Sequence, residues 1–242
     1  MLEKAFPGHP YSRSIIGLGE HLKNPRLSQL IKYYQDWYVP ENMALILVGN
    51  VNTQKIMGRI AAAFGKLRPQ TIPERKIYPE VPIQGRTQYS TKYSQYPSVV
   101  MIYNGVKSGH PDEIAIDICL QLLSNTSGTG LLDKQTINGD LLGGSAQMLS
   151  FREQGRNIVM GVPYYDEAQR RFESNKSVEK KLLSSVQQIA AGEFESWVVD
   201  AIKVNLCRDF DLQMESNDFK AQLLMNAFIN EEDLNRVLNF KD

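Results

Sequence analysis

Apolar residues follow two spacings along this chain, one typical of strands and one typical of helices. Met43–Val48 (MALILV) is apolar at every position, which predicts a strand covered on both faces. A helix is predicted before this strand, from Asn24 and Pro25 to about Trp37. Another is predicted after it, because apolar residues recur at helical spacing up to Phe64. The first part of the chain is therefore predicted to form a helix, a strand and a helix.

In the second part of the chain, apolar and polar residues alternate less regularly, but the predicted strands precede the long predicted helices. Strands followed by antiparallel helices predict an α+β fold, with antiparallel-type sheets covered by helices on one face. The helix beginning at Gly109–Asp112 is expected to bury Ile114, Ala115, Ile118, Cys119 and Leu122. The predicted elements are an exposed strand at Arg86–Ser94, strands at Ser98–Val106, Gly144–Leu149 and Asn157–Val162, and further helices at Leu131–Ile137, Lys176–Ala191, Phe194–Asp211, Phe219–Asn230 and Glu231–Leu238.

Residues 68–85 differ from both neighbouring segments in their proline content. Four prolines fall between Leu67 and Gly85, together with charged residues and few large apolar groups. Proline at this density resists both helix and central strand, so the segment is predicted to be an extended linker. The linker divides the chain into residues 1–67 and residues 86–242, which are predicted to belong to two domains.

Composition and charge exclude several kinds of partner. Lys plus Arg equals Asp plus Glu, at 27 each, so no net charge attracts nucleic acid or an anionic membrane. No apolar run approaches the roughly 18–20 residues that span a bilayer. Binding to nucleic acid and a membrane span are therefore not expected. Cys119 and Cys207 lie far apart on apolar helical faces, and we expect buried free thiols.

Several spaced motifs in this sequence resemble one protein family. The motifs are GHPYSRSIIG at Gly8–Gly17, YYQDWYVPENMALILVGNVN at Tyr33–Asn52 and AAFGKL at Ala62–Leu67. Together they resemble the pitrilysin/insulysin family of zinc metallopeptidases, which includes the mitochondrial processing peptidases. The phrases LLSNTSGTGL and IAAGEFE continue the resemblance through the second part of the chain.

The resemblance implies an organisation and a set of partners. Residues 1–67 would be the C-terminal part of a zinc-bearing first domain, which is incomplete here, and residues 86–242 a second, homologous-type domain. In the family such domains enclose peptides in a chamber and cleave them through a zinc-activated water. The implied partners are peptide substrates, the missing N-terminal zinc-binding portion, and a homologous second half or partner subunit.

The resemblance also places the zinc ligands outside this chain. The family's site needs an HxxEH helix and a later glutamate. The three histidines here, His9, His21 and His110, include no pair four residues apart. In the family both ligand histidines and the glutamate precede the HPYS-like loop, so they would lie upstream of Met1. Zinc is expected in a full-length parent, and no metal-ligating or catalytic residue and no cofactor is expected in this chain.

Arg156 and Tyr164 are the candidate substrate-binding residues. Family members carry an arginine on a strand and a tyrosine just after it, which contact the substrate near the scissile bond, and GRNIVMGVPYY loosely resembles that pattern. Such a pair could stabilise a developing oxyanion. The pair usually belongs to the other homologous half, and these residue types are common at strand ends, so a structural role is the alternative.

Other motifs are expected to be structural. His9 and Tyr11, in the GHPYSR loop, could lie near a catalytic domain, but a surface turn set by Pro and Gly is favoured. Ser124–Gly130 (SNTSGTG) lacks the G-x-x-x-x-G-K-[ST] form of a phosphate loop and is expected to break two helices. A Ser-His-Asp site is not predicted, because no G-x-S-x-G occurs.

Three functional hypotheses remain. In the first, the parent is a zinc-dependent metalloendopeptidase, and this chain is inactive alone while it supplies chamber wall and substrate contacts. In the second, the chain is a non-catalytic structural or peptide-binding subunit of the same family. In the third, it is an unrelated α+β binding domain, which a buried strand within residues 68–85 would favour.

Overall fold

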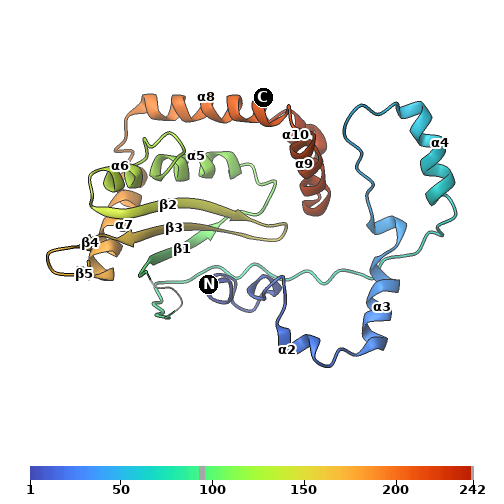
Figure 1. Ribbon diagram of the computed structural model, residues 1–242, viewed down its shortest axis with the longest axis horizontal. Helices are drawn as coiled ribbons and strands as arrows, with labels where there is room; N and C mark the ends of the chain where they lie inside the picture. The colour runs from blue at the N-terminus through green and yellow to red at the C-terminus, as the bar shows by residue number, and fades with distance from the viewer. Residues whose placement is uncertain (93–95, 241–242) are drawn as a thin grey trace. The chain divides into compact units, whose positions relative to one another are not determined.

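The computed structural model of the protein describes residues 1–92 and 96–240 (Figure 1). The chain divides into two units by the contacts between its residues, and each is described by itself. Unit 1 comprises Met1–Val81 and Asp211–Phe240, and unit 2 comprises Pro82–Phe210. The domain boundaries at residues 67 and 86 stay a prediction.

Unit 2 contains a three-stranded antiparallel sheet with the strand order β1-β3-β2. Met101 of β1, Val159 of β3 and Ala146 of β2 lie side by side across the sheet. The strands predicted at Ser98–Val106, Gly144–Leu149 and Asn157–Val162 are confirmed, and α6 occupies the predicted residues. The elements are β1 (Val99–Gly105), α5 (Glu113–Leu123), α6 (Leu131–Ile137), β2 (Leu141–Ser150), β3 (Gly155–Pro163), β4 (Tyr165–Asp166), β5 (Arg171–Phe172), α7 (Asn175–Ala190) and α8 (Ser196–Gln213), the last of which ends in unit 1.

Helices cover one face of this sheet. Leu132 of α6 and Val178 and Leu182 of α7 are fully buried against Val159 of β3. Gly161 of β3 allows the close approach of α7, because a Cβ there would lie 3.0 Å from side-chain carbons of Leu182 and Val178. Figure 1 shows α5 and α6 on one face of the sheet. The predicted α+β class, with helices on one sheet face, is confirmed.

A second helical layer lies over α5. Val198 and Ile202 of α8 are buried against Leu122 of α5, with Ile118 and Leu206 beside them. Figure 1 shows α8 beyond α5, on the side away from the sheet. Unit 2 therefore stacks the three-stranded sheet, a layer of helices and one further helix, with apolar contacts between successive layers. A separate two-stranded sheet, β4-β5, follows β3.

The Ser124–Gly130 loop is closed by one carboxylate. Asp133 accepts hydrogen bonds from the Ser124 hydroxyl (2.8 Å), the Asn125 N–H (2.9 Å) and the Gly130 N–H (3.0 Å). A carboxylate that accepts several donors holds them strongly. The loop thus joins α5 to α6, as the sequence predicted.

Unit 1 consists mainly of separate helices and extended segments. Among its described residues, the buried apolar ones are Ala5, Phe6, Val39 and Ala227. The elements are α1 (Leu2–Ala5), η1 (Pro10–Ser12), α2 (Gly19–Leu22), α3 (Leu27–Trp37), η2 (Pro40–Asn42), α4 (Thr53–Phe64), α9 (Asn217–Asn230) and α10 (Leu234–Leu238). The helices predicted on either side of Met43–Val48 are confirmed, although α3 begins at Leu27 and is capped at Arg26.

The prediction of a buried strand at Met43–Val48 is wrong for this structure. The segment is extended, but it pairs with no strand among the described residues, and Met43 and Leu45 are each 53% exposed. A strand needs neighbours to take up its backbone hydrogen bonds. All five strands that the structure describes lie in unit 2, so the segment has the sequence of a central strand without a sheet around it.

Three smaller predictions also differ from the structure. The exposed strand at Arg86–Ser94 is wrong for residues 86–92, which have no strand partner, and residues 93 and 94 lie outside the described residues. Cys119 is exposed, because α5 is apolar on most sides and buries Leu120 and Leu123 instead. The last helix begins at Leu234, three residues after the predicted start.

The proline-rich segment contains no helix or strand, and side-chain contacts hold it at two places. Within unit 1, the Arg75 guanidinium donates to Asn42 (2.7 Å) and lies over the Trp37 ring. Within unit 2, the Asn104 side chain makes two hydrogen bonds with the backbone of Ile83, at 2.8 and 3.1 Å. The buried strand that would have favoured an unrelated binding domain is not found in residues 68–85.

Candidate functional site

Arg156 lies near the start of β3, between Asn104 of β1 and Leu149 of β2. Its side chain is fully buried. The guanidinium donates to the backbone oxygen of Gly155 (2.7 Å) and to the side-chain oxygen of Gln154 (3.3 Å). A buried guanidinium with these acceptors holds the β2–β3 turn, and no peptide reaches it in this conformation.

Tyr164 follows the other end of β3 and is 44% exposed. Its backbone oxygen accepts a hydrogen bond from the Glu173 N–H (2.9 Å). Eight residues of extended strand separate Tyr164 from Arg156, which corresponds to about 26 Å along the chain. The structure therefore does not bring the two candidate residues together, and their contact with a substrate stays a prediction.

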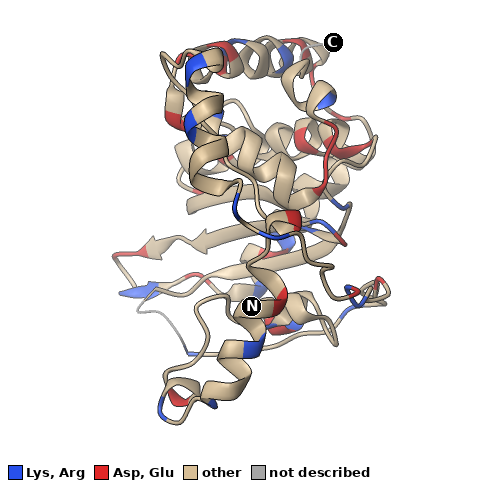
Figure 2. Ribbon diagram, turned by 90° about the vertical axis from the view of Figure 1, so that its right-hand side faces the viewer, with Lys and Arg blue, Asp and Glu red and all other residues tan. Residues whose placement is uncertain are grey.

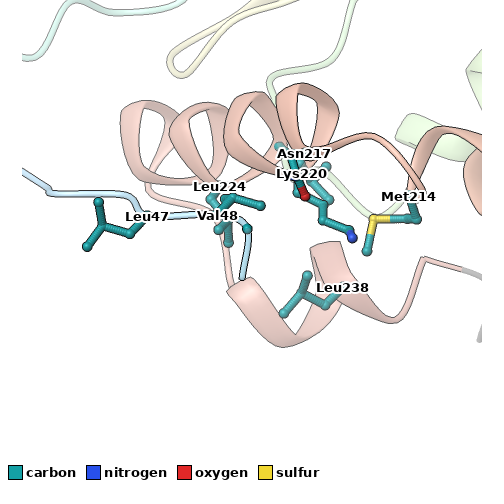
Figure 3. A pocket seen from close by; sticks show the side chains of 9 residues that line it. Leu47, Val48, Met214, Asn217, Lys220, Leu224 and Leu238 are labelled. Atoms are coloured by element: carbon teal, nitrogen blue, oxygen red, sulfur yellow. The ribbon is translucent and has the colours of Figure 1, made fainter. Parts of the chain in front are cut away.

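A pocket of about 400 Å³ in unit 1 was not expected from the sequence (Figure 3). Leu47, Val48 and Gly49 line one side, and Leu223 and Leu224 of α9 line another. Its polar members are Asn217 and Lys220, and Met214 and Leu238 complete the lining. The sequence feature that could have indicated this pocket is the α9 segment. That helix is apolar on most sides, so it has two faces to bury against other parts of the chain.

The histidines are held locally in separate places. His9 is buried, its Nδ1 accepts the Tyr11 N–H (3.2 Å), and its ring contacts those of Tyr11 and Tyr78. This contact set fits the favoured structural role of the GHPYSR loop. The Nδ1 atom of His110 accepts the Asp112 N–H (3.1 Å). Across residues 1–92 and 96–240, no group of three His, Cys, Asp or Glu side chains could hold a metal ion.

The pKa shifts in unit 2 arise from burial and from nearby charges. Burial raises the pKa of Asp117, and the neighbouring Glu113 carboxylate raises it further. Burial also raises the pKa of Tyr103, with a smaller effect from Glu179, which pairs with Arg86.

Glu173 shifts in the other direction. Burial raises the pKa of this carboxyl, but hydrogen bonds from Lys181 (2.7 Å) and Ser177 (2.5 Å) outweigh that effect and lower the pKa below its ordinary value. Lys181 also donates to the backbone oxygen of Asp140 (2.6 Å), the residue before β2, so it links the start of β2 to α7. Asp117, Tyr103 and Glu173 lie on different elements and form no common site.

Charged residues of both signs are interspersed along the chain (Figure 2). This distribution agrees with the equal numbers of acidic and basic residues. Among the described residues, no helix is both long enough and apolar enough to cross a membrane.

Comparison with known proteins identifies the family. The family described as Peptidase M16 inactive domain matches residues 26–206. The chain belongs to this family. The match includes α3, the extended Met43–Val48 segment and the whole helix-covered sheet, so the resemblance to zinc metallopeptidases is confirmed.

Two of the relatives carry the names of zinc proteases. The zinc protease PqqE of Helicobacter pylori is 21% identical over 234 residues, which cover 94% of this chain and 51% of that protein. The probable zinc protease PqqL of Escherichia coli is 31% identical over a shorter stretch of 67 residues, 28% of this chain and 7% of that protein. The chain therefore spans about half the length of the first of these relatives.

Solved structures show the same fold. A protease from Helicobacter pylori superimposes with a TM-score of 0.79 at 20% identity, over 98% of this chain and 57% of that one. A peptidase M16 inactive domain from Pseudomonas fluorescens superimposes with a TM-score of 0.78 at 15% identity, over 99% of this chain and 56% of that one. At these identities the likeness shows the fold alone.

Proposed function

We propose that this chain is the non-catalytic, substrate-enclosing part of a larger zinc-dependent metallopeptidase that degrades or processes peptides. The observation that carries the proposal is the match of residues 26–206 to the inactive domain of the M16 peptidases, together with relatives named as zinc proteases. In the proposal, zinc and the general base are supplied by protein outside these 242 residues. Residues 1–67 would complete a zinc-bearing domain, residues 68–85 would link it, and residues 86–242 would form the second domain.

Unit 2 is the best candidate for the chamber wall. One face of its sheet is covered by α5, α6 and α7, so the opposite face is the one left for a peptide. Arg156 and Ile158 alternate with Val159 along β3 and belong to that opposite face, because successive strand residues point to opposite sides. Both side chains are buried here, so a peptide would contact other positions of this face or follow a rearrangement. Tyr164 is the accessible member of the predicted pair, and Arg156 would need a rearrangement to touch a peptide.

The test measures hydrolysis and binding separately. We expect the chain, incubated with zinc and fluorescein-labelled casein, to release no fluorescent peptides. We expect labelled casein peptides to bind it weakly, which fluorescence anisotropy measures. Hydrolysis by the chain alone would contradict its inactivity, and lack of any binding would contradict the peptide contacts.

The contribution of Tyr164 has a matched control in its neighbour. Tyr164→Ala is expected to weaken peptide binding, whereas Tyr165→Ala is not, although both side chains are exposed and adjacent. Tyr165 instead packs its ring on Phe172 at 4.9 Å. Equal losses in the two variants would show that Tyr164 has no specific part in binding.

The alternative function is a structural or peptide-binding subunit without zinc chemistry. The sequence of the longer protein that carries these residues decides between the two. An intact HxxEH with a later glutamate supports the peptidase, and the loss of those residues supports the subunit.

A further inference from the structure

The dipeptide Asn-Gly occurs twice in this chain, and both copies lie in unit 2. Asn104 and Gly105 belong to β1, and Asn138 and Gly139 follow α6. An asparagine before glycine is prone to lose its side-chain amide, because glycine has no Cβ to hinder attack by its own backbone nitrogen. Both asparagines are exposed, so exposure does not distinguish the two pairs.

The first pair is held by its strand and by its own side chain. The side-chain oxygen of Asn104 accepts the Ile83 N–H (2.8 Å), and its side-chain nitrogen donates to the Ile83 oxygen (3.1 Å). A Cβ on Gly105 would lie 2.8 Å from the backbone nitrogen of Arg156 in the paired strand β3. The amide of Asn104 is therefore occupied, and the backbone beside it has little room to rotate.

The second pair lies in the turn between α6 and β2, where neither restraint is present. The Asn138 side chain makes no hydrogen bond with any residue that the structure describes. A Cβ on Gly139 would meet no atom within 4 Å, so the backbone there is surrounded by open space. Gly139 also has the left-handed φ of +80° that glycine adopts without strain.

Two backbone hydrogen bonds close this turn, and both belong to a helix end. The Gly139 N–H donates to Thr136 (3.1 Å), and the Asp140 N–H donates to Gln135 (2.8 Å). They are the last bonds of α6, which has only 7 residues. The end of a short helix opens at a low cost in free energy, so the Gly139 nitrogen can leave its acceptor and reach the Asn138 side chain.

We propose that Asn138 is a site of spontaneous deamidation in the folded chain and that the fold protects Asn104. The Gly139 backbone nitrogen, after its proton passes to hydroxide, attacks the Cγ atom of Asn138. The N–Cγ bond forms and the Cγ–Nδ2 bond breaks, and Nδ2 takes a proton from water and leaves as ammonia. Water then opens the cyclic succinimide at either carbonyl and gives aspartate or isoaspartate. Water is the only co-reactant, and it replaces ammonia overall.

The product differs from the original chain in charge and in backbone length. Each reaction adds one negative charge to a chain whose formal net charge is zero. The new carboxylate stands at the C-terminal end of α6, which the helix dipole makes unfavourable for an anion. Isoaspartate also lengthens the backbone just before Leu141, a buried core residue of β2. The site is independent of the proposed peptidase function, since neither zinc nor a peptide takes part.

The test compares the two asparagines in the folded and the unfolded chain. Peptide mass spectrometry after incubation in mildly alkaline buffer measures the modified fraction at each position. We expect Asn138 to react at least about tenfold faster than Asn104 in the folded chain, and the two to react within about threefold in urea, where the turn and the strand are lost. Equal rates in the folded chain, or a folded chain in which Asn138 does not react, would overturn the proposal.

A matched pair of variants identifies the residue that produces the acidic form. Asn138→Gln should abolish the acidic form that ion-exchange chromatography separates, because glutamine would have to close a larger ring. Asn104→Gln is the control and should give as much acidic form as the unchanged chain. Circular dichroism verifies that both variants fold. An acidic form that persists in Asn138→Gln, or that disappears in Asn104→Gln, would show that the reaction occurs elsewhere.

Discussion

Units 1 and 2 place similar leucines in opposite surroundings. Leu132 and Leu182 of unit 2 lie on helices that pack against a sheet, and both are fully buried. Leu27 and Leu30 of unit 1 lie on α3, and they are 69% and 55% exposed. Leu182 belongs to the apolar stripe of α7, as Leu27 and Leu30 belong to that of α3. The difference is that only unit 2 contains the sheet against which such a stripe is buried.

This contrast shows that the apolar stripe of a helix indicates the need for a packing partner, but the stripe does not provide that partner. Most of the stability of a helix in a protein comes from packing its apolar face, and not from the helix itself. In unit 2 the partners are β2 and β3, which the same chain provides. In unit 1 the Met43–Val48 segment has the composition of a sheet's centre and no neighbouring strand among the described residues.

The largest expected effect comes from truncating a leucine in each unit. Leu182→Ala should lower the free energy of unfolding of unit 2 by about 2–5 kcal/mol, whereas Leu30→Ala should lower that of unit 1 by less than about 0.5 kcal/mol. Each unit holds one of the two tryptophans, Trp37 and Trp197. Urea unfolding followed by fluorescence, with the other tryptophan replaced by Phe, reads the units separately. Equal losses would remove the contrast between the two units.

Two glycine-to-alanine substitutions are expected to change the free energy of unfolding by smaller amounts and in opposite directions. Gly161→Ala puts a methyl group 3.0 Å from Leu182 and Val178 and should destabilise unit 2 by about 1–3 kcal/mol. Gly58→Ala, within α4, meets no atom within 4 Å and should stabilise that helix by about 0.5–1 kcal/mol. Thermal unfolding followed by circular dichroism measures both. A loss of stability in Gly58→Ala would mean that α4 is packed more closely than its exposure indicates.

The smallest effect is the pH dependence set by Glu173 and Lys181. Because the folded pKa of Glu173 lies below its ordinary value of 4.5, this carboxylate stabilises the fold above about pH 4.5, and the contribution disappears as the pH falls through the folded pKa. Lys181→Met should therefore lower stability by about 0.5–1 kcal/mol at pH 7 and by less near pH 3.

Lys180→Met is the control for that measurement, since Lys180 is exposed on the same helix. Urea unfolding at a series of pH values should give the same curve for Lys180→Met as for the unchanged chain. A Lys181→Met difference that stayed constant down to pH 3 would assign the effect to the bond with the Asp140 oxygen instead.

Most helices and strands could be predicted because their residues carry local patterns. Each of these patterns spans only a few neighbouring residues. Examples are the apolar stripe of α7, the glycines around α6 and the apolar runs of β1 and β3. The buried face of α5 was predicted only in part: Leu122 is buried as expected, but Ile114 and Cys119 are exposed. A helix apolar on most sides offers several equivalent stripes, and only its neighbours choose among them. Cys119 was placed inside for that reason and lies outside.

The candidate site residues were also predictable only in part. The sequence indicated Arg156 and Tyr164 from a motif, and the strand predicted between them already implied their separation, but it could not indicate that Arg156 is buried. Sequence spacing says nothing of which end of a strand is accessible. The pocket beside the Met43–Val48 segment was not predicted, because Val48 and Leu224 are far apart in the sequence and meet only in the fold.

The sequence alone determined the family, the α+β class and the positions of most helices and strands, because motifs and apolar periodicity are local properties of the chain. Only the tertiary structure decided which apolar faces are covered. Burial depends on a second surface, and a strand depends on a neighbour for its hydrogen bonds. The stretch MALILV shows the difference: its residues specify the centre of a sheet, and the fold of these residues leaves it open.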